Sequence, residues 1–78
     1  MYYSVKSVSV IEKFTLLLVF ESGEKKTFDM KPYLENGIFS ELKQGDNFYK
    51  IKISYDTISW ENGADFDPEV LYEKGVTA

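Results

Sequence analysis

The segment from residue 65 to residue 69 carries the densest set of side chains that could do chemistry. Asp65, Asp67 and Glu69 alternate there with apolar residues, so three carboxylates fall within five positions. Such a set could bind a hard cation through oxygen, although the twelve-residue loop of an EF-hand is missing. The same residues also have a structural interpretation. Asp67 would cap a helix, Glu69 would oppose the helix dipole, and Asp65 would stabilise a turn at Gly63.

Cysteine and histidine are both absent from the 78 residues. Their absence excludes a thiolate nucleophile, a zinc site of the usual type and a Ser-His-Asp triad. Paired carboxylates could still do general acid–base work, but nothing else in so short a chain indicates a shaped pocket of about 300 Å³ or more. We therefore predict that the protein is not an enzyme and uses no cofactor.

The charge composition narrows the class of partner. All nine basic residues are lysine and thirteen residues are acidic, which gives a net charge of −4. Without arginine and with this charge, direct binding of nucleic acid is disfavoured. The longest apolar run, residues 16–20, is too short to cross a bilayer, and the chain does not open with a signal-peptide pattern. We expect a cytoplasmic protein that does not bind membranes.

Acidic residues gather around the single tryptophan near the end of the sequence. Core packing is the favoured role for Trp60, but a partly exposed ring would make it an anchor for a protein interface. An acidic surface with such an anchor could cover a basic site on another protein. The candidate partner-binding residues are Trp60, Glu61, Asp65, Asp67, Glu69 and Glu73.

The elements that must position these side chains follow from patterns of hydrophobicity and turn residues. Hydrophobic residues make up 44% of the chain and aromatic residues 17%, enough for the core of one small soluble domain spanning residues 1–78. We predict an α+β fold whose helices cover one face of a sheet. Its elements are an antiparallel three-stranded meander (3–11, 14–21, 25–30), a short broken helical segment (30–44), a β-hairpin (48–55, 57–60) and a short C-terminal helix that begins at Pro68 after Asp67.

The positions of apolar residues in two predicted strands indicate which faces of those strands are buried. In residues 14–21, one face holds Leu16, Leu18 and Phe20, and the other holds Leu17 and Val19. A strand that is apolar on both faces is typical of a central, covered position, or of a face covered by a second chain. In residues 48–55, alternation predicts a core face of Tyr49, Ile51, Ile53 and Tyr55, with Lys50, Lys52 and Ser54 toward water. The helical segment is expected to break at Asn36–Gly37, and Tyr2 and Tyr3 could extend a sheet edge or lie at a contact between copies.

The combined motifs resemble the bacterial domain-of-unknown-function family 2442. The residues that carry the resemblance are Leu18-Val19-Phe20-Glu21-Ser22-Gly23-Glu24, Phe28-Asp29-Met30, Gly37-Ile38-Phe39 with Leu42, and Ile58 through Glu69 followed by Leu71-Tyr72. The resemblance implies a small α+β domain, no particular reaction and no catalytic residues. Similar domains occur alone or joined to a helix-turn-helix module. They are often encoded beside a small protein of domain-of-unknown-function family 4160, an arrangement that looks like a toxin–antitoxin pair.

These observations lead to one leading functional hypothesis and two alternatives. The leading hypothesis is a non-catalytic protein-binding or regulatory domain, the antitoxin-like partner in a two-gene bacterial module, whose ligand is the product of an adjacent gene. The first alternative is a homodimer or other homo-oligomeric structural module that uses an exposed sheet face or an edge strand. The second is a small-ligand or metal-binding domain that uses the loop of Asp65 and Asp67.

Overall fold

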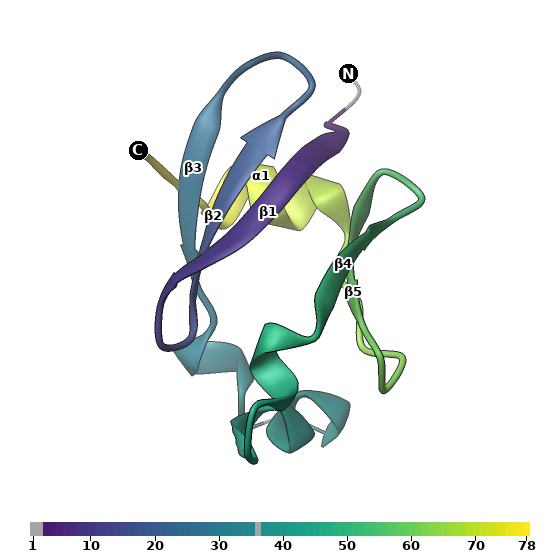
Figure 1. Ribbon diagram of the computed structural model, residues 1–78. Coiled ribbons are helices and arrows are strands. Elements are labelled where there is room, and N and C mark those ends of the chain that lie inside the picture. Colours follow the sequence, from purple (N-terminus) through teal and green to yellow (C-terminus); the bar gives the residue numbers. More distant parts are fainter. Residues whose placement is uncertain (1–2, 36) are drawn as a thin grey trace.

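The computed structural model describes residues 3–35 and 37–78 of the chain. Its elements confirm the predicted α+β class, with mostly antiparallel strands and a short C-terminal helix (Figure 1). In chain order they are β1 (Val5–Glu12), β2 (Thr15–Phe20), β3 (Lys25–Asp29), the 3₁₀ helices η1 (Lys31–Tyr33), η2 (Gly37–Lys43) and η3 (Asn47–Tyr49), β4 (Ile51–Ser54), β5 (Thr57–Trp60), α1 (Pro68–Lys74) and β6 (Val76–Thr77).

The larger sheet has the strand order β1-β2-β3-β6, and all neighbours are antiparallel. The meander of the first three strands is confirmed, and β2 is central as its pattern predicts. Leu16, Leu18 and Phe20 of β2 are fully buried on one face. The strand β6 is not predicted by the sequence pattern, because two residues give no periodicity. It is held instead by pairing of Val76 and Thr77 with β3.

The second sheet is a separate hairpin of β4 and β5, and here the sequence prediction is wrong at both ends of the first strand. Phe48 and Tyr49 belong to η3, and that turn buries Phe48 while it leaves Tyr49 56% exposed. Tyr55 lies in the hairpin turn and is 97% exposed. Between these ends Ile51 and Ile53 share a face with the buried Trp60 and Ile58, as the alternation predicts. The predicted burial is nevertheless wrong for Ile53, which is 39% exposed at the edge of the core, and the predicted exposure is wrong for Ser54, which is half-buried.

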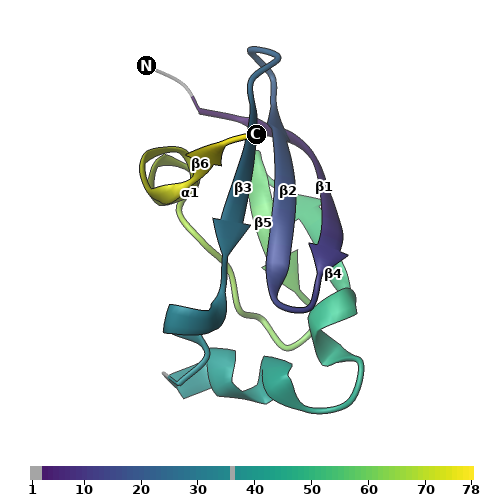
Figure 2. The same ribbon diagram turned by 90° about the vertical axis from the view of Figure 1, so that its left-hand side faces the viewer.

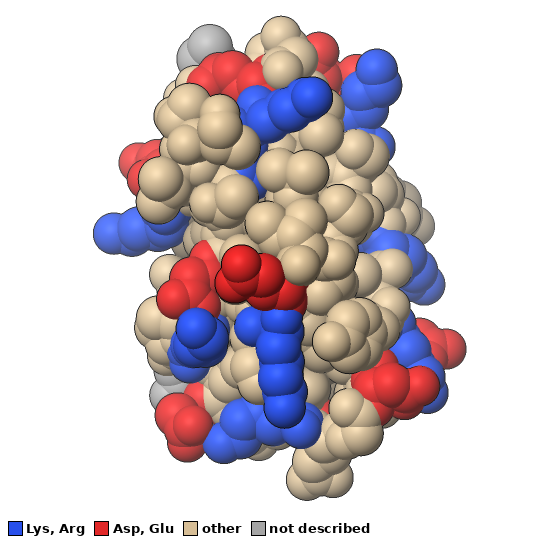
Figure 3. Space-filling model, turned by 60° about the vertical axis from the view of Figure 1, so that its left-hand side comes forward, with Lys and Arg blue, Asp and Glu red and all other residues tan. Residues whose placement is uncertain are grey.

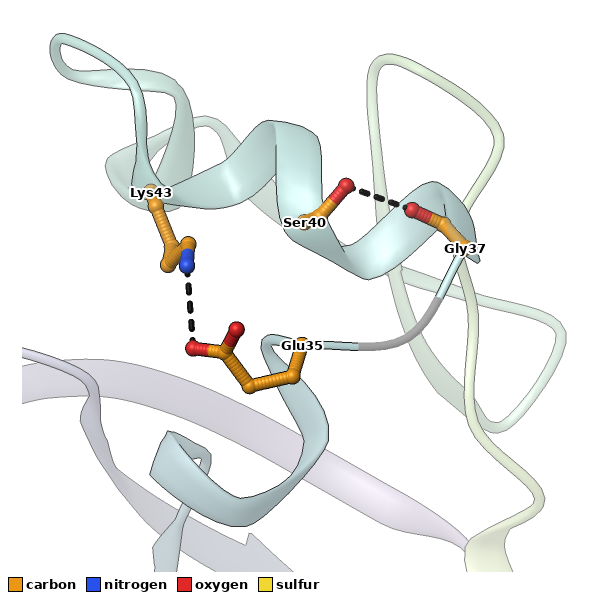
Figure 4. Close-up of polar contacts among 4 residues, drawn as sticks. All are labelled: Glu35, Gly37, Ser40 and Lys43. Atoms are coloured by element: carbon orange, nitrogen blue, oxygen red, sulfur yellow. Dashed lines mark hydrogen bonds and ion pairs between the residues drawn. The ribbon is translucent and has the colours of Figure 1, made fainter.

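The predicted helical segment is a series of short 3₁₀ helices at one end of the sheet. The side chain of Asp29 accepts a hydrogen bond from the Lys31 amide at 3.0 Å where η1 begins. Ser40 Oγ donates to the Gly37 carbonyl at 2.7 Å within η2, and Lys43 Nζ reaches back to Glu35 Oε1 at 2.9 Å (Figure 4). These local contacts hold turns that are too short to persist alone. Asn36 of the predicted break lies outside the described residues, as does Tyr2.

Packing places α1 and the β4–β5 hairpin on the same side of the larger sheet (Figures 1 and 2). The core between these layers holds Leu71 of α1, Ile58 and Trp60 of β5, and Phe28 of β3, all nearly inaccessible to solvent. Rings of Phe39, Phe48 and Phe66 surround Trp60. Among the described residues, no helix is long and apolar enough to cross a membrane.

Candidate functional site

A surface hollow of about 220 Å³ lies where the β4–β5 turn meets the start of α1. Three segments that are distant in the sequence build it: the residues ahead of β1, the hairpin turn, and the first turn of the helix. Its lining residues are Tyr3, Ser4, Tyr55, Asp56, Asp67, Pro68 and Glu69. We call this hollow the tyrosine–acid hollow.

The wall from the hairpin has an unusual backbone conformation. Ser54 pairs with Thr57, so Tyr55 and Asp56 form a two-residue turn with φ angles of 49° and 72°. Both angles lie in the left-handed region, which two-residue hairpins favour for Asn and Gly. The Val5 amide donates to the Asp56 carbonyl at 2.8 Å and fixes this turn to the larger sheet. The Tyr55 side chain is therefore displayed to solvent on a rigid support.

The opposite wall is the N-terminal turn of α1. The Asp67 carboxylate accepts a hydrogen bond from the Glu69 amide at 2.8 Å, which makes Asp67 the N-cap predicted from the sequence. Pro68 occupies the first helical position, where its missing N–H is not needed. Both carboxylates remain exposed at the surface. The helix start therefore delivers two negative charges to the rim of the hollow.

Tyr3 forms the third wall and is held by stacking. Its ring lies 4.2 Å from that of Tyr72, centroid to centroid, with 21° between the ring planes. The Tyr72 hydroxyl donates to Glu24 Oε1 at 2.6 Å, and this hydrogen bond to a carboxylate is the main reason that the pKa of Tyr72 is raised. Lys26 Nζ lies 3.9 Å from the centroid of the Tyr72 ring. The cluster joins α1 to β3 and fixes the position of Tyr3.

The structure does not bring the six predicted partner-binding residues together. Trp60 is only 2% exposed, and its indole N–H donates to the Phe48 carbonyl at 3.0 Å. The favoured core role therefore describes Trp60, and the alternative of an exposed anchor does not hold in this structure. Glu61 lies at a different hollow, with its carboxylate 3.9 Å from Lys50 Nζ.

The remaining acids also take separate positions. Asp65 forms an isolated backbone bridge with Ser59 and does not line the tyrosine–acid hollow. Glu73 is exposed further along α1. Only Asp67 and Glu69 of the predicted set line the hollow. Within residues 3–35 and 37–78, no three acidic side chains come close enough to hold a metal ion, so the geometry gives no support to a cation site at Asp65 and Asp67.

Comparison with known families assigns the chain. The model of the family described as "Protein of unknown function (DUF2442)" matches residues 5–77. The chain belongs to this family. The match spans every strand and helix of the fold, so the DUF2442 domain and the α+β unit described above are the same. No curated protein and no solved structure matches the chain.

Within this DUF2442 domain, Tyr55 is the site residue that sequence reasoning placed wrongly. Alternation continued through Ile51 and Ile53 and so assigned Tyr55 to the core. The signal that could have found it is the two-residue spacing between the β-prone runs that end at Ser54 and begin at Thr57. That signal is weak here, because Tyr55 and Asp56 are not the Asn-Gly pair that usually marks such a turn.

Proposed function

We propose that this chain is a non-catalytic protein-binding domain whose tyrosine–acid hollow receives a basic side chain of a partner protein. The observation that carries the proposal is the placement of Tyr55. Tyr55 is 97% exposed, so it contributes almost nothing to the core, yet it occupies a backbone conformation that disfavours tyrosine. Folding alone does not explain this residue, whereas exposed tyrosines are frequent anchors of protein interfaces.

The chemistry of the walls supports a cationic ligand group. Tyr3 and Tyr55 line the hollow, and a Lys or Arg side chain is attracted to the face of a tyrosine ring by the ring quadrupole. Asp67 and Glu69 offer carboxylate oxygens that can pair with the same charge. The net charge of −4 would speed the approach of a basic partner. We expect the partner to present one Lys or Arg from a loop or a chain end.

We propose that the partner is the product of an adjacent gene and that the two proteins meet in the bacterial cytoplasm. The domain would then act as the antitoxin-like or regulatory half of a two-gene module. Masking is the mechanism that we propose, because a hollow of about 220 Å³ suits the capture of one side chain. The absence of histidine and cysteine from the chain further supports a role in binding.

Co-expression with the adjacent gene product, followed by calorimetric titration of the purified proteins, tests the proposal. Tyr55→Asn should weaken binding by about 10-fold or more, as expected for an interface anchor. Glu69→Gln should weaken it less and reduce its dependence on salt. Tyr49→Asn is the matched control, because Tyr49 is also an exposed tyrosine but does not line the hollow. Equal affinities for the Tyr55→Asn variant and the unsubstituted protein would exclude the hollow as the binding site.

A further inference from the structure

The larger sheet has one face that no described element covers. Side chains alternate along each strand, and Leu16, Leu18 and Phe28 point into the core. The residues between them in the ladder point the opposite way. Figure 2 shows no helix or strand in front of this side of the sheet. We call this surface the open face. It consists of Ser7, Ser9 and Glu12 of β1, Thr15, Leu17 and Val19 of β2, Lys25, Thr27 and Asp29 of β3, and Val76 of β6.

The centre of the open face is less polar than a solvated sheet face normally is. Leu17 and Val19 lie side by side with Thr27 and Lys25 in the ladder, and Val76 at the edge is 67% exposed. Antiparallel sheets with one face in water usually alternate apolar with polar residues, which β2 does not do. Figure 3 shows a band of uncharged atoms on this side of the molecule, between groups of lysine and acidic side chains. The composition indicates a face that another surface covers.

The two charges that β3 places on the open face are arranged symmetrically about Thr27. Lys25 precedes Thr27 by two residues and Asp29 follows it by two, so one cation and one anion lie at equal distances along the same strand. The two charges are separated by about 13 Å, too far for a direct ion pair within one chain. Within residues 3–35 and 37–78, neither side chain takes part in an ion pair.

We propose that the open face binds the open face of a second copy of this chain. The two-fold axis would lie between the two sheets and run across the strands at Leu17 and Thr27. This rotation reverses the direction along β3, so each Lys25 meets Asp29 of the other copy, and Leu17 meets its own equivalent. An axis along the strands would instead bring the two Lys25 side chains together. Charge complementarity therefore selects both the occupant and its orientation.

The dimensions of the open face set the expected strength of this contact. Five residues of strand length and four strands give an area of about 17 Å by about 15–19 Å. This area is smaller than the roughly 800 Å² per partner that stable complexes bury. We therefore expect a weak dimer in rapid exchange with the monomer.

Sedimentation across a concentration series tests the self-association. The average mass of the unsubstituted protein should rise toward that of two chains between about 10 µM and about 1 mM. Leu17→Thr keeps the strand propensity but removes apolar surface, and it should shift the midpoint of this rise at least several-fold upward. Lys52→Glu is the matched control, because Lys52 is an exposed strand lysine of the other sheet, and it should leave the midpoint unchanged.

Charge exchange between two variants tests the orientation. Lys25→Glu alone and Asp29→Lys alone should each remain monomeric over the same range, because like charges would meet across the axis. An equimolar mixture of the two should associate, since Glu at 25 would meet Lys at 29 and Asp29 would meet Lys25. If the Asp29→Lys variant is unfolded by circular dichroism, Asp29→Asn keeps the oxygen that accepts from Lys31 and should still weaken the dimer.

The contrary outcomes are separate from those of the proposed function. A strictly monomeric protein at about 1 mM would overturn the inference, as would a dimer that both Lys25→Glu and Leu17→Thr leave intact. The inference would also be overturned if the unsubstituted protein does not self-associate and Leu17→Thr loses binding to the adjacent gene product. That pair of results would show that the open face binds a different protein. None of these results bears on Tyr55, which lies on the other sheet.

Discussion

The backbone strain at Tyr55 leads to a prediction that runs against the usual effect of mutation. Tyr55→Asn should stabilise the fold by about 1 kcal/mol, because a left-handed conformation costs most residues roughly 1–2 kcal/mol and asparagine tolerates it better. The substitution removes almost no buried surface, since the side chain is 97% exposed.

The expected shift in melting temperature follows from the size of the chain. At about 2.1 cal/mol/K per residue, the 78 residues give an unfolding entropy of about 160 cal/mol/K. A gain of about 1 kcal/mol therefore raises the midpoint by about 6 °C. Circular dichroism during heating, at concentrations where the protein is monomeric, measures this shift, and the midpoint of urea unfolding checks it independently.

Tyr49→Asn provides the control for replacing an exposed tyrosine by asparagine. Tyr49 has no positive φ, so this variant should show no gain in stability. A Tyr55→Asn variant that melts at or below the midpoint of the unsubstituted protein would refute the argument that the turn is strained. A gain in stability combined with a loss of partner binding would show that Tyr55 serves binding at the expense of folding.

Three further predictions concern the cap, the Tyr72 hydroxyl and the edge of the core. Asp67→Ala should lower the free energy of unfolding by about 1 kcal/mol in urea, because the N-cap of α1 is lost, and Asp67→Asn should lower it less. The pKa of Tyr72 is raised in the folded state, mainly by its hydrogen bond to Glu24. That hydrogen bond therefore stabilises the fold below pH 10.0, which is the pKa of tyrosine in the unfolded chain, and the stabilisation is lost as the pH rises through the pKa of the folded state. The Tyr72→Phe variant should therefore be less stable than the unsubstituted protein at neutral pH. Urea unfolding at increasing pH should show this difference in free energy shrinking above pH 10.0. A difference that stays constant would contradict the role of the Tyr72 hydrogen bond. Ile58→Ala should lower the free energy of unfolding by about 2–5 kcal/mol, because Ile58 is fully buried. Its pairing partner Ile53 is 39% exposed, so Ile53→Ala should lower that free energy by only about 1 kcal/mol. Equal losses for the two variants in urea unfolding would contradict the placement of Ile53 at the edge of the core.

The sequence predicts the parts of the fold whose signals are local. The continuous apolar run of β2 marks the central strand, and Asp67 followed by Pro68 marks the start of α1. The parts that it misses depend on partners distant in the chain. The strand β6 is defined by its pairing with β3, and Phe48 takes the place predicted for Tyr49 in the core, where it packs against Trp60 of β5.

The same distinction applies to the candidate site. Sequence reasoning finds Asp67 and Glu69, because an N-cap and the first turn of a helix have a recognisable pattern. It does not find that Tyr3 and Tyr55 flank these acids, since the three segments are joined by contacts between residues distant in the chain, such as the hydrogen bond from Val5 to Asp56 and the stacking of Tyr3 on Tyr72. It also groups Glu61 and Glu73 with them, because closeness along the chain gives no indication of which side of the domain each residue occupies.

The burial of Trp60 gives the molecule an internal optical reporter. As the only tryptophan, it emits from one known place, enclosed by phenylalanine rings and hydrogen-bonded to the Phe48 carbonyl. Its fluorescence should be blue-shifted in the native state and should move to longer wavelength when water reaches the indole. Because Phe48 and Trp60 belong to different elements, that single signal reports the packing of η3 against the β4–β5 hairpin.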